Sequence, residues 1–223
     1  MRAIASECIG TAFLVAAVVG SGIMGERLSG GNMALALLAS SITTGAMLVT
    51  LIFTFAPISG AHFNPAVTLA SAFERAFPWS RVPSYIVSQT IGAIAGVLAA
   101  HAMFEHPLIA LSHHSRTGAA QLFSEFVATF GLLVVVHGTR KRAAVVPLAV
   151  AAYITAAYLF TSSTSFANPA VTIARSLTDT FSGLEPSGIP GFIGAQLLGA
   201  LAAALLFRWI GNGNRPDSIQ GQH

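Results

Sequence analysis

The stretch Ser59-Gly-Ala-His-Phe-Asn-Pro-Ala-Val-Thr68 decides the fold, and a second stretch, Thr164-Ser-Phe-Ala-Asn-Pro-Ala-Val-Thr172, repeats its core. The two asparagines, Asn64 and Asn168, lie 104 positions apart. Asparagine is a favoured helix N-cap, and proline is favoured at the first helical position, where its missing N–H would have no partner. Each stretch therefore predicts the start of a short helix of about three turns. Two such half-helices, in matching places of two halves of a chain, point to a transport site at the membrane midplane.

The composition predicts an integral membrane protein built from helices. Of the 223 residues, 54% are hydrophobic and only 9% are charged, whereas about a quarter are charged in an ordinary soluble domain. The mean hydropathy is +0.71, and a membrane barrel would show alternating segments of about ten residues instead. The pI near 9.6 does not indicate a nucleic-acid partner, because the basic residues fall in loops. Cys8 is the single cysteine, so no internal disulfide can form.

Six segments are apolar over about 20 residues, the length that crosses a bilayer. They are 3–24, 33–56, 82–104, 119–138, 145–162 and 188–210. The runs 64–77 and 168–180 are too short to cross and are the predicted half-helices. We therefore expect one membrane domain over 1–210, with a first repeat over 1–110 and a second over 119–210. The polar segment 211–223 is predicted to be a disordered cytoplasmic tail.

The basic residues predict the orientation. Eight of the eleven lysines and arginines fall on one side of the six spans, namely Arg2, Arg75, Arg81, Arg140, Lys141, Arg142, Arg208 and Arg215. The positive-inside rule then places both termini in the cytoplasm. Each half has three spans, so the second half is inverted relative to the first, and the two half-helix N-termini meet near the midplane.

These half-helix starts predict a path for neutral, hydrogen-bonding solutes. Each N-terminus carries roughly half a positive charge, so the facing pair repels cations, including hydrated protons. The side chains of Asn64 and Asn168 offer N–H donors to a passing oxygen atom. Irregular backbone at this depth is tolerated where it lines a watery cavity, and its carbonyl groups can accept hydrogen bonds. The predicted pore-lining loop residues are Gly60, Ala61, His62, Phe63, Thr164 and Phe166.

The motifs resemble those of the aquaporin and aquaglyceroporin (major intrinsic protein) family. The resemblance covers residues 1 to about 210 and rests on 59–68, on the second Asn-Pro-Ala and on Glu7 and Glu125. It implies an all-α membrane protein with six transmembrane helices and two re-entrant half-helices in an inverted repeat. It further implies a passive channel rather than an enzyme, with no cofactor, assembled as a homotetramer in the inner (plasma) membrane. The matching pore-centre residues are Asn64, Pro65, Ala66, Asn168, Pro169 and Ala170.

Several polar side chains have two readings. Glu7 and Glu125 are costly at membrane depth and need partners. The family resemblance implies that they brace the two pore loops, while the alternative is a proton-coupling carboxylate in an active transporter. His62 either titrates as a pH switch or hydrogen-bonds the loop. The external histidines, His106, His113 and His114, either bind a metal or are solvated, and we expect no metal site.

The chain departs from the family at the predicted selectivity filter. Most members carry arginine directly after the second Asn-Pro-Ala, where this chain has Val171. Matching the remaining positions gives a filter of Thr44, Ala156, Ser165 and Val171. None is aromatic or charged, so we expect a wide, arginine-free filter. Arg175 follows Val171 by four residues, on the same helix face. It either lines the outer vestibule, or pairs with Asp179 or snorkels to the interface.

A valine at this position, among small residues, resembles the aquaporin-like channels of bacterial arsenic-resistance operons. The resemblance implies passage of arsenite as neutral arsenous acid, of methylated arsenicals and of glycerol-like solutes, with some water. The partners expected are these solutes and the lipid bilayer. Four alternatives stay open, namely a general glycerol facilitator, a water-selective channel, a secondary active transporter and a purely structural membrane scaffold.

Overall fold

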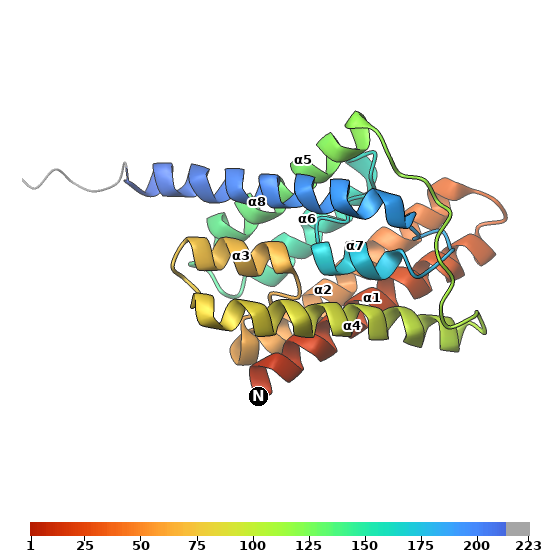
Figure 1. The fold of residues 1–223 in the computed structure, drawn as a ribbon, viewed down its shortest axis with the longest axis horizontal. Coiled ribbons are helices and arrows are strands. Elements are labelled where there is room, and N and C mark those ends of the chain that lie inside the picture. The colour runs from red at the N-terminus through yellow and green to blue at the C-terminus, as the bar shows by residue number, and fades with distance from the viewer. Residues whose placement is uncertain (213–223) are drawn as a thin grey trace, which may run out of the picture.

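The structure, a computed structural model, describes residues 1–212. Within them, six long helices surround two short ones, and no strand is formed (Figure 1). The long helices are α1 (Arg2–Leu28), α2 (Met33–Ser59), α4 (Val82–Met103), α5 (Ala119–Thr139), α6 (Val146–Phe160) and α8 (Ile189–Asn212). The short ones are α3 (Pro65–Phe73) and α7 (Pro169–Arg175). The predicted tail 211–223 lies outside the described residues, apart from Gly211 and Asn212 at the end of α8.

The six long helices correspond to the six predicted spans. Five of them are long and apolar enough to cross a membrane. The sixth, α6, is apolar but has only 15 residues, which gives a length of about 22 Å, against a hydrocarbon core of about 30 Å. The α8 end that leads to the tail and the N-terminus both lie in the left half of Figure 1, as an even number of crossings requires.

The two half-helices are shorter than predicted. α3 has 9 residues and α7 has 7, so the expected ends at 77 and 180 are wrong. After α3 the backbone turns sharply, with Arg75 at φ 60°. After α7 the backbone leaves the helix because it pairs with the preceding loop, where the N–H groups of Ala110 and Ser112 donate to the carbonyls of Leu177 and Ser176.

Close helix contacts place the half-helices at the centre of the bundle. α1 packs along α4, and α5 packs along α8 in the matching place of the second repeat. Gly92 of α4 faces the carbonyl of Cys8, and Gly199 of α8 faces the carbonyl of Phe126. Glycine permits backbones to approach closely in a membrane protein. In Figure 1, α3 and α7 lie roughly end to end between α8 and α4.

We expect Gly92→Ala to destabilise the protein by about 1–3 kcal/mol, because the added methyl group would overlap the Cys8 carbonyl and push α1 away from α4. Thermal unfolding in detergent measures the effect. Gly194→Ala is the matched control, because a methyl group there would meet no atom within 4 Å apart from the neighbouring backbone of its own helix. Equal loss of stability in both variants would contradict close packing at Gly92.

Candidate functional site

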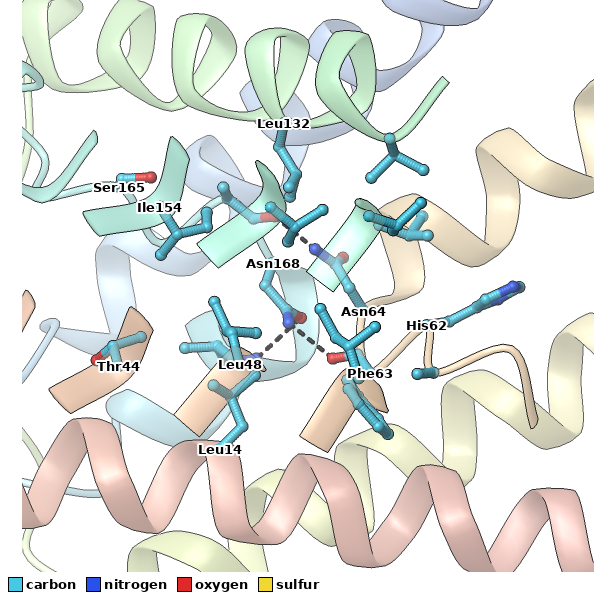
Figure 2. A pocket seen from close by; sticks show the side chains of 18 of the residues that line it. Leu14, Thr44, Leu48, His62, Phe63, Asn64, Leu132, Ile154, Ser165 and Asn168 are labelled. Atoms are coloured by element: carbon cyan, nitrogen blue, oxygen red, sulfur yellow. Dashed lines mark hydrogen bonds between the residues drawn. The ribbon is translucent and has the colours of Figure 1, made fainter. Parts of the chain in front are cut away.

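The two asparagines tie the half-helices to each other. Asn64 Oδ1 accepts from the backbone N–H of Ala66 at 2.8 Å, and Asn168 Oδ1 accepts from that of Ala170 at 3.0 Å. Both asparagines are therefore N-caps, as the sequence predicts. Asn64 Nδ2 donates to the carbonyl of Ala167 at 2.7 Å, and Asn168 Nδ2 donates to that of Phe63 at 2.8 Å (Figure 2). Each amide group has a second N–H, which is left for a solute in the cavity.

The backbone before each asparagine takes the same unusual course. In the first loop, Gly60, Ala61 and Phe63 have φ values of 91°, 50° and 49°. In the second loop, the equivalent residues Thr164, Ser165 and Ala167 have 62°, 53° and 48°. Positive φ costs a residue other than glycine about 1–3 kcal/mol, so both loops need support from their surroundings.

Two buried glutamates provide that support. Glu7 of α1 accepts hydrogen bonds from the backbone N–H groups of His62 at 3.0 Å and Phe63 at 2.7 Å. Glu125 of α5 accepts from those of Phe166 and Ala167, both at 2.9 Å. These are the contacts that the bracing interpretation requires. A fully buried carboxylate at membrane depth is tolerated because charged acceptors form strong hydrogen bonds with these N–H groups.

A second pair of hydrogen-bonded side chains, Gln89 and Gln196, follows the same inverted repeat. Gln89 Nε2 donates to Glu7 at 2.8 Å and to Thr68 Oγ1 at 3.0 Å. In the second repeat, Gln196 Nε2 donates to Glu125 at 2.6 Å and to Thr172 Oγ1 at 2.8 Å. Each network therefore connects a spanning helix, a glutamate and a half-helix. The His62 ring joins the first network through Thr68, since Nδ1 lies 3.0 Å from Thr68 Oγ1.

A cavity of about 310 Å³ runs past the asparagines. Much of its lining is apolar and consists of Leu14, Val18, Leu48, Ile52, Val67, Leu132, Val136, Val150 and Ile154. Residues of the two loops, 60–63 and 165–167, complete the lining together with the asparagines. Thr44 and Ser165 lie at one end of this view and His62 at the other, with Asn64 and Asn168 between them (Figure 2). A polar solute can thus exchange hydrogen bonds with the loop residues and the asparagines, while the apolar side chains offer none.

Most of the predicted pore residues line this cavity, including Gly60, Ala61, His62, Phe63, Phe166 and both asparagines. Thr164 does not, because its hydroxyl group turns toward Arg116, 3.4 Å from Nη1. The motif residues Pro65, Ala66, Pro169 and Ala170 are buried at the helix starts and do not line the cavity either. Their contribution is to fix the two helix ends.

The predicted filter is wrong at one position. Thr44, Ser165 and Val171 line the cavity, but Ala156 is exposed on the outer face of α6. Two residues further along, Tyr158 faces inward, and its hydroxyl group lies 3.0 Å from Thr44 Oγ1. Ala156 and Tyr158 are separated by about 200° around the helix axis. The two-residue error in alignment therefore selected a residue on the opposite face of α6. An aromatic residue therefore lies beside Thr44 in the cavity.

Arg175 lines the same cavity, as the vestibule interpretation of this residue requires. Its side chain is only 3% exposed. Nε donates to the carbonyl of Ser182, and the guanidinium group lies over the Phe166 ring, 3.4 Å from its centroid. Among the described residues no carboxylate pairs with it, since Asp179 pairs with His113 instead. The terminal nitrogens of Arg175 form no hydrogen bond with described protein atoms, and they are available to a solute.

The external histidines belong to loop contacts. His113 Nδ1 lies 3.1 Å from Asp179 Oδ2, and the backbone N–H of His113 donates to Asp179 Oδ1 at 2.9 Å. These hydrogen bonds hold the pKa of Asp179 below its ordinary value. In the part of the chain that is described, no three metal-ligating side chains gather.

A buried polar path between two half-helix ends, braced from both repeats and open to a cavity, defines a membrane channel. The chain matches the profile of the family described as Major intrinsic protein over residues 1–166. It is 51% identical over 216 residues to the aquaglyceroporin AqpS of Rhizobium meliloti (strain 1021), covering 96% of this chain and 92% of that protein. Nodulin-26 of Glycine max is 31% identical, covering 98% of this chain and 81% of that protein.

The chain therefore belongs to the major intrinsic protein family, and it is a passive channel of the aquaglyceroporin type rather than an enzyme. The X-ray structure of the aquaglyceroporin from Plasmodium falciparum superposes with a TM-score of 0.70 at 19% identity, covering 92% of this chain and 94% of that one. That likeness confirms the predicted fold.

Proposed function

We propose that the channel conducts small neutral solutes with several hydroxyl groups, arsenous acid and glycerol among them, together with water. The single observation that carries this proposal is the filter region. Val171 leaves apolar space where most family members carry arginine, and the guanidinium group of Arg175 lies one helical turn away, over Phe166. The relative from Rhizobium meliloti is named an aquaglyceroporin, which supports passage of solutes larger than water.

The polar groups of the filter suit such a solute. Ser165 Oγ is buried without a hydrogen-bond partner among the described residues, Tyr158 and Thr44 offer hydroxyl groups, and Arg175 offers N–H donors. A molecule with three hydroxyl groups, uncharged at neutral pH, can replace its water of hydration with these groups. An ion cannot do so, because leaving water without a full set of partners is costly for a charge. We further propose a homotetramer in the inner membrane with both termini in the cytoplasm, in line with the family resemblance and the basic residues.

Stopped-flow light scattering on proteoliposomes tests the proposal by comparing the fluxes of water, glycerol and arsenous acid with those of empty liposomes. We expect all three to pass, without sensitivity to a protonophore. A channel that conducts water but excludes both solutes would overturn the proposal. Passage of glycerol without arsenous acid would favour the general glycerol facilitator, and protonophore-sensitive flux would favour a transporter.

We expect Arg175→Met to lower the flux of glycerol and arsenous acid relative to water by about tenfold, the effect of losing one hydrogen bond to a charged group. Methionine keeps the apolar stem but removes the donors, so a solute loses a partner when it sheds water. Arg27→Met is the matched control, because Arg27 lies outside the cavity and donates to the carbonyl of Phe104. An unchanged flux ratio in Arg175→Met would show that the guanidinium group does not contact solutes.

A further inference from the structure

The cavity carries a second guanidinium group at its other end. Arg140 directly follows α5 and lines the cavity together with Ser71, Ala143 and Val146. We call this end the α3 mouth, because α3 runs from the asparagines toward it while α7 and Arg175 run the opposite way (Figure 1). The predicted topology makes it the cytoplasmic mouth. The family motifs do not include any of these four residues.

A buried carboxylate holds Arg140 in place. Arg140 Nη1 donates to Glu74 Oε2 at 2.9 Å, and the Glu74 side chain is only 6% exposed. The same oxygen atom lies 3.1 Å from Nδ1 of His137, whose side chain is 4% exposed. Glu74 directly follows α3, and His137 lies in the last turn of α5. The three side chains therefore link the first half-helix to the end of a spanning helix.

The chemistry of this cluster fixes the guanidinium group on the cavity wall. An ionised carboxylate only accepts hydrogen bonds, and Glu74 Oε2 accepts one from Arg140 Nη1 while the His137 ring lies beside it. Glu74 Oε1 and His137 Nε2 are buried without a partner among the described residues. Glu74 thus has few ways to be stabilised other than its contact with Arg140, and separating a buried pair leaves an uncompensated charge. Burial raises the pKa of Glu74, against the opposing effect of Arg140.

The N–H groups of Arg140 that do not contact Glu74 remain available to solutes. The side chain is 53% exposed, and only Nη1 has a partner among the described residues. Its remaining N–H groups can donate to the oxygen atoms of a solute at the mouth. Neighbouring charged groups do not compete for Glu74, since Arg75, Lys141 and Arg142 are exposed and Arg208 of α8 stacks on Phe73. From α8, the Phe207 ring covers His137.

We propose that Arg140 is a specificity-determining residue at the α3 mouth and that Glu74 and His137 are its positioning residues. A guanidinium group held against the wall narrows the mouth, offers donors to small hydroxylated solutes and repels cations. Released from Glu74, the charged group would move into bulk water, as long basic side chains do at membrane surfaces, and the mouth would widen. This proposal rests on the channel activity of the family and not on arsenous acid as the solute.

The test compares the flux of erythritol, a polyol larger than glycerol, with the flux of water in proteoliposomes. We expect Arg140→Ala to raise the erythritol-to-water ratio about threefold, which corresponds to a barrier lower by roughly 0.7 kcal/mol. Lys141→Ala removes a neighbouring charge outside the cavity and should leave the ratio unchanged. Equal ratios in the two variants would overturn the proposal. Arg140 is half exposed at the end of a helix, so its loss should not prevent folding.

A double variant and the pH dependence of the flux ratio test the positioning role of Glu74 separately. Glu74→Gln should raise the ratio as Arg140→Ala does, and the double variant should add nothing further, because both changes remove the same contact. Acidifying the solution at the α3 mouth should also raise the ratio in the wild-type protein as Glu74 becomes protonated, but not in Arg140→Ala. Additive effects or a flat wild-type pH profile would contradict this role. A wild-type protein that passes water and polyols but excludes arsenous acid would refute the proposed solute and leave this test intact.

Discussion

Glu125→Gln is expected to reduce both water and solute flux at least tenfold and to lower the free energy of unfolding by about 3 kcal/mol. Glu125 accepts three hydrogen bonds at present, from the backbone of Phe166 and Ala167 and from Gln196 Nε2. Glutamine keeps one acceptor oxygen and places an NH₂ group against these donors. At least one buried donor then loses its partner, at a cost of about 1–3 kcal/mol.

The loop that loses this hydrogen bond is already in an unfavourable backbone conformation. Ser165 and Ala167 hold positive φ values of 53° and 48°, a conformation that persists only when the surroundings impose it. If the loop relaxes, its carbonyl groups leave the cavity wall and the hydrogen bond from Asn64 to the Ala167 carbonyl is lost. The flux of all solutes should therefore fall together.

Glu7, which occupies the matching position in the first repeat, provides a comparison for Glu125. Glu7→Gln should have a similar effect through the first loop, because Glu7 accepts the equivalent three hydrogen bonds, from two backbone N–H groups of that loop and from Gln89. Glu26→Gln changes an exposed glutamate at the end of α1 and should leave flux and stability unchanged. Size-exclusion chromatography and circular dichroism verify that each variant is folded. A folded Glu125→Gln protein with full flux would refute the bracing role.

Local signals in the sequence were sufficient for the half-helix starts, whereas the bracing role of the two glutamates came from the family resemblance. Asparagine and proline fix each helix start, but a carboxylate in an apolar span indicates only that Glu7 and Glu125 need partners, not which partners they have. The lengths of α3 and α7 were not predictable in the same way. α3 ends in a local turn at Arg75, and α7 ends where its backbone pairs with a distant loop, through Ser112 and Ser176, a contact that leaves no local pattern.

The prediction of Ala156 as a filter residue was wrong for a physical reason. Counting back from Asn168 to the fifth span crosses the end of α6 at Phe160, where the backbone leaves the helix, so the helical phase is lost. The apolar residues that line the cavity recur every fourth position, as Val150 and Ile154 do before Tyr158. In a membrane helix, however, the lipid-facing side is equally apolar, and hydrophobic periodicity does not separate the two faces. Arg140 and Glu74 are 66 positions apart in sequence, and their contact has no sequence signature either.

Val171→Arg is expected to lower the flux of glycerol and arsenous acid at least tenfold while lowering water flux less than threefold, a difference in barrier of at least about 0.7 kcal/mol. Val171 lines the cavity with 5% of its surface exposed, so a guanidinium group at this position has no space except the path itself. It would also lie four residues before Arg175 on α7, where two like charges repel each other. The added side chain narrows the path, so a larger solute is excluded before water.

Two further variants separate size from charge in this experiment. Val171→Ile keeps a branched apolar side chain and should preserve the ratio of solute to water flux. The double variant Val171→Arg with Arg175→Val keeps a single guanidinium group and moves it one helical turn toward the asparagines. If the position of the guanidinium group sets the width, the double variant excludes glycerol as Val171→Arg does. If repulsion between the two arginines is responsible, the double variant recovers solute flux. Equal loss of water and solutes in Val171→Arg would show instead that Val171 does not border the narrowest part of the path.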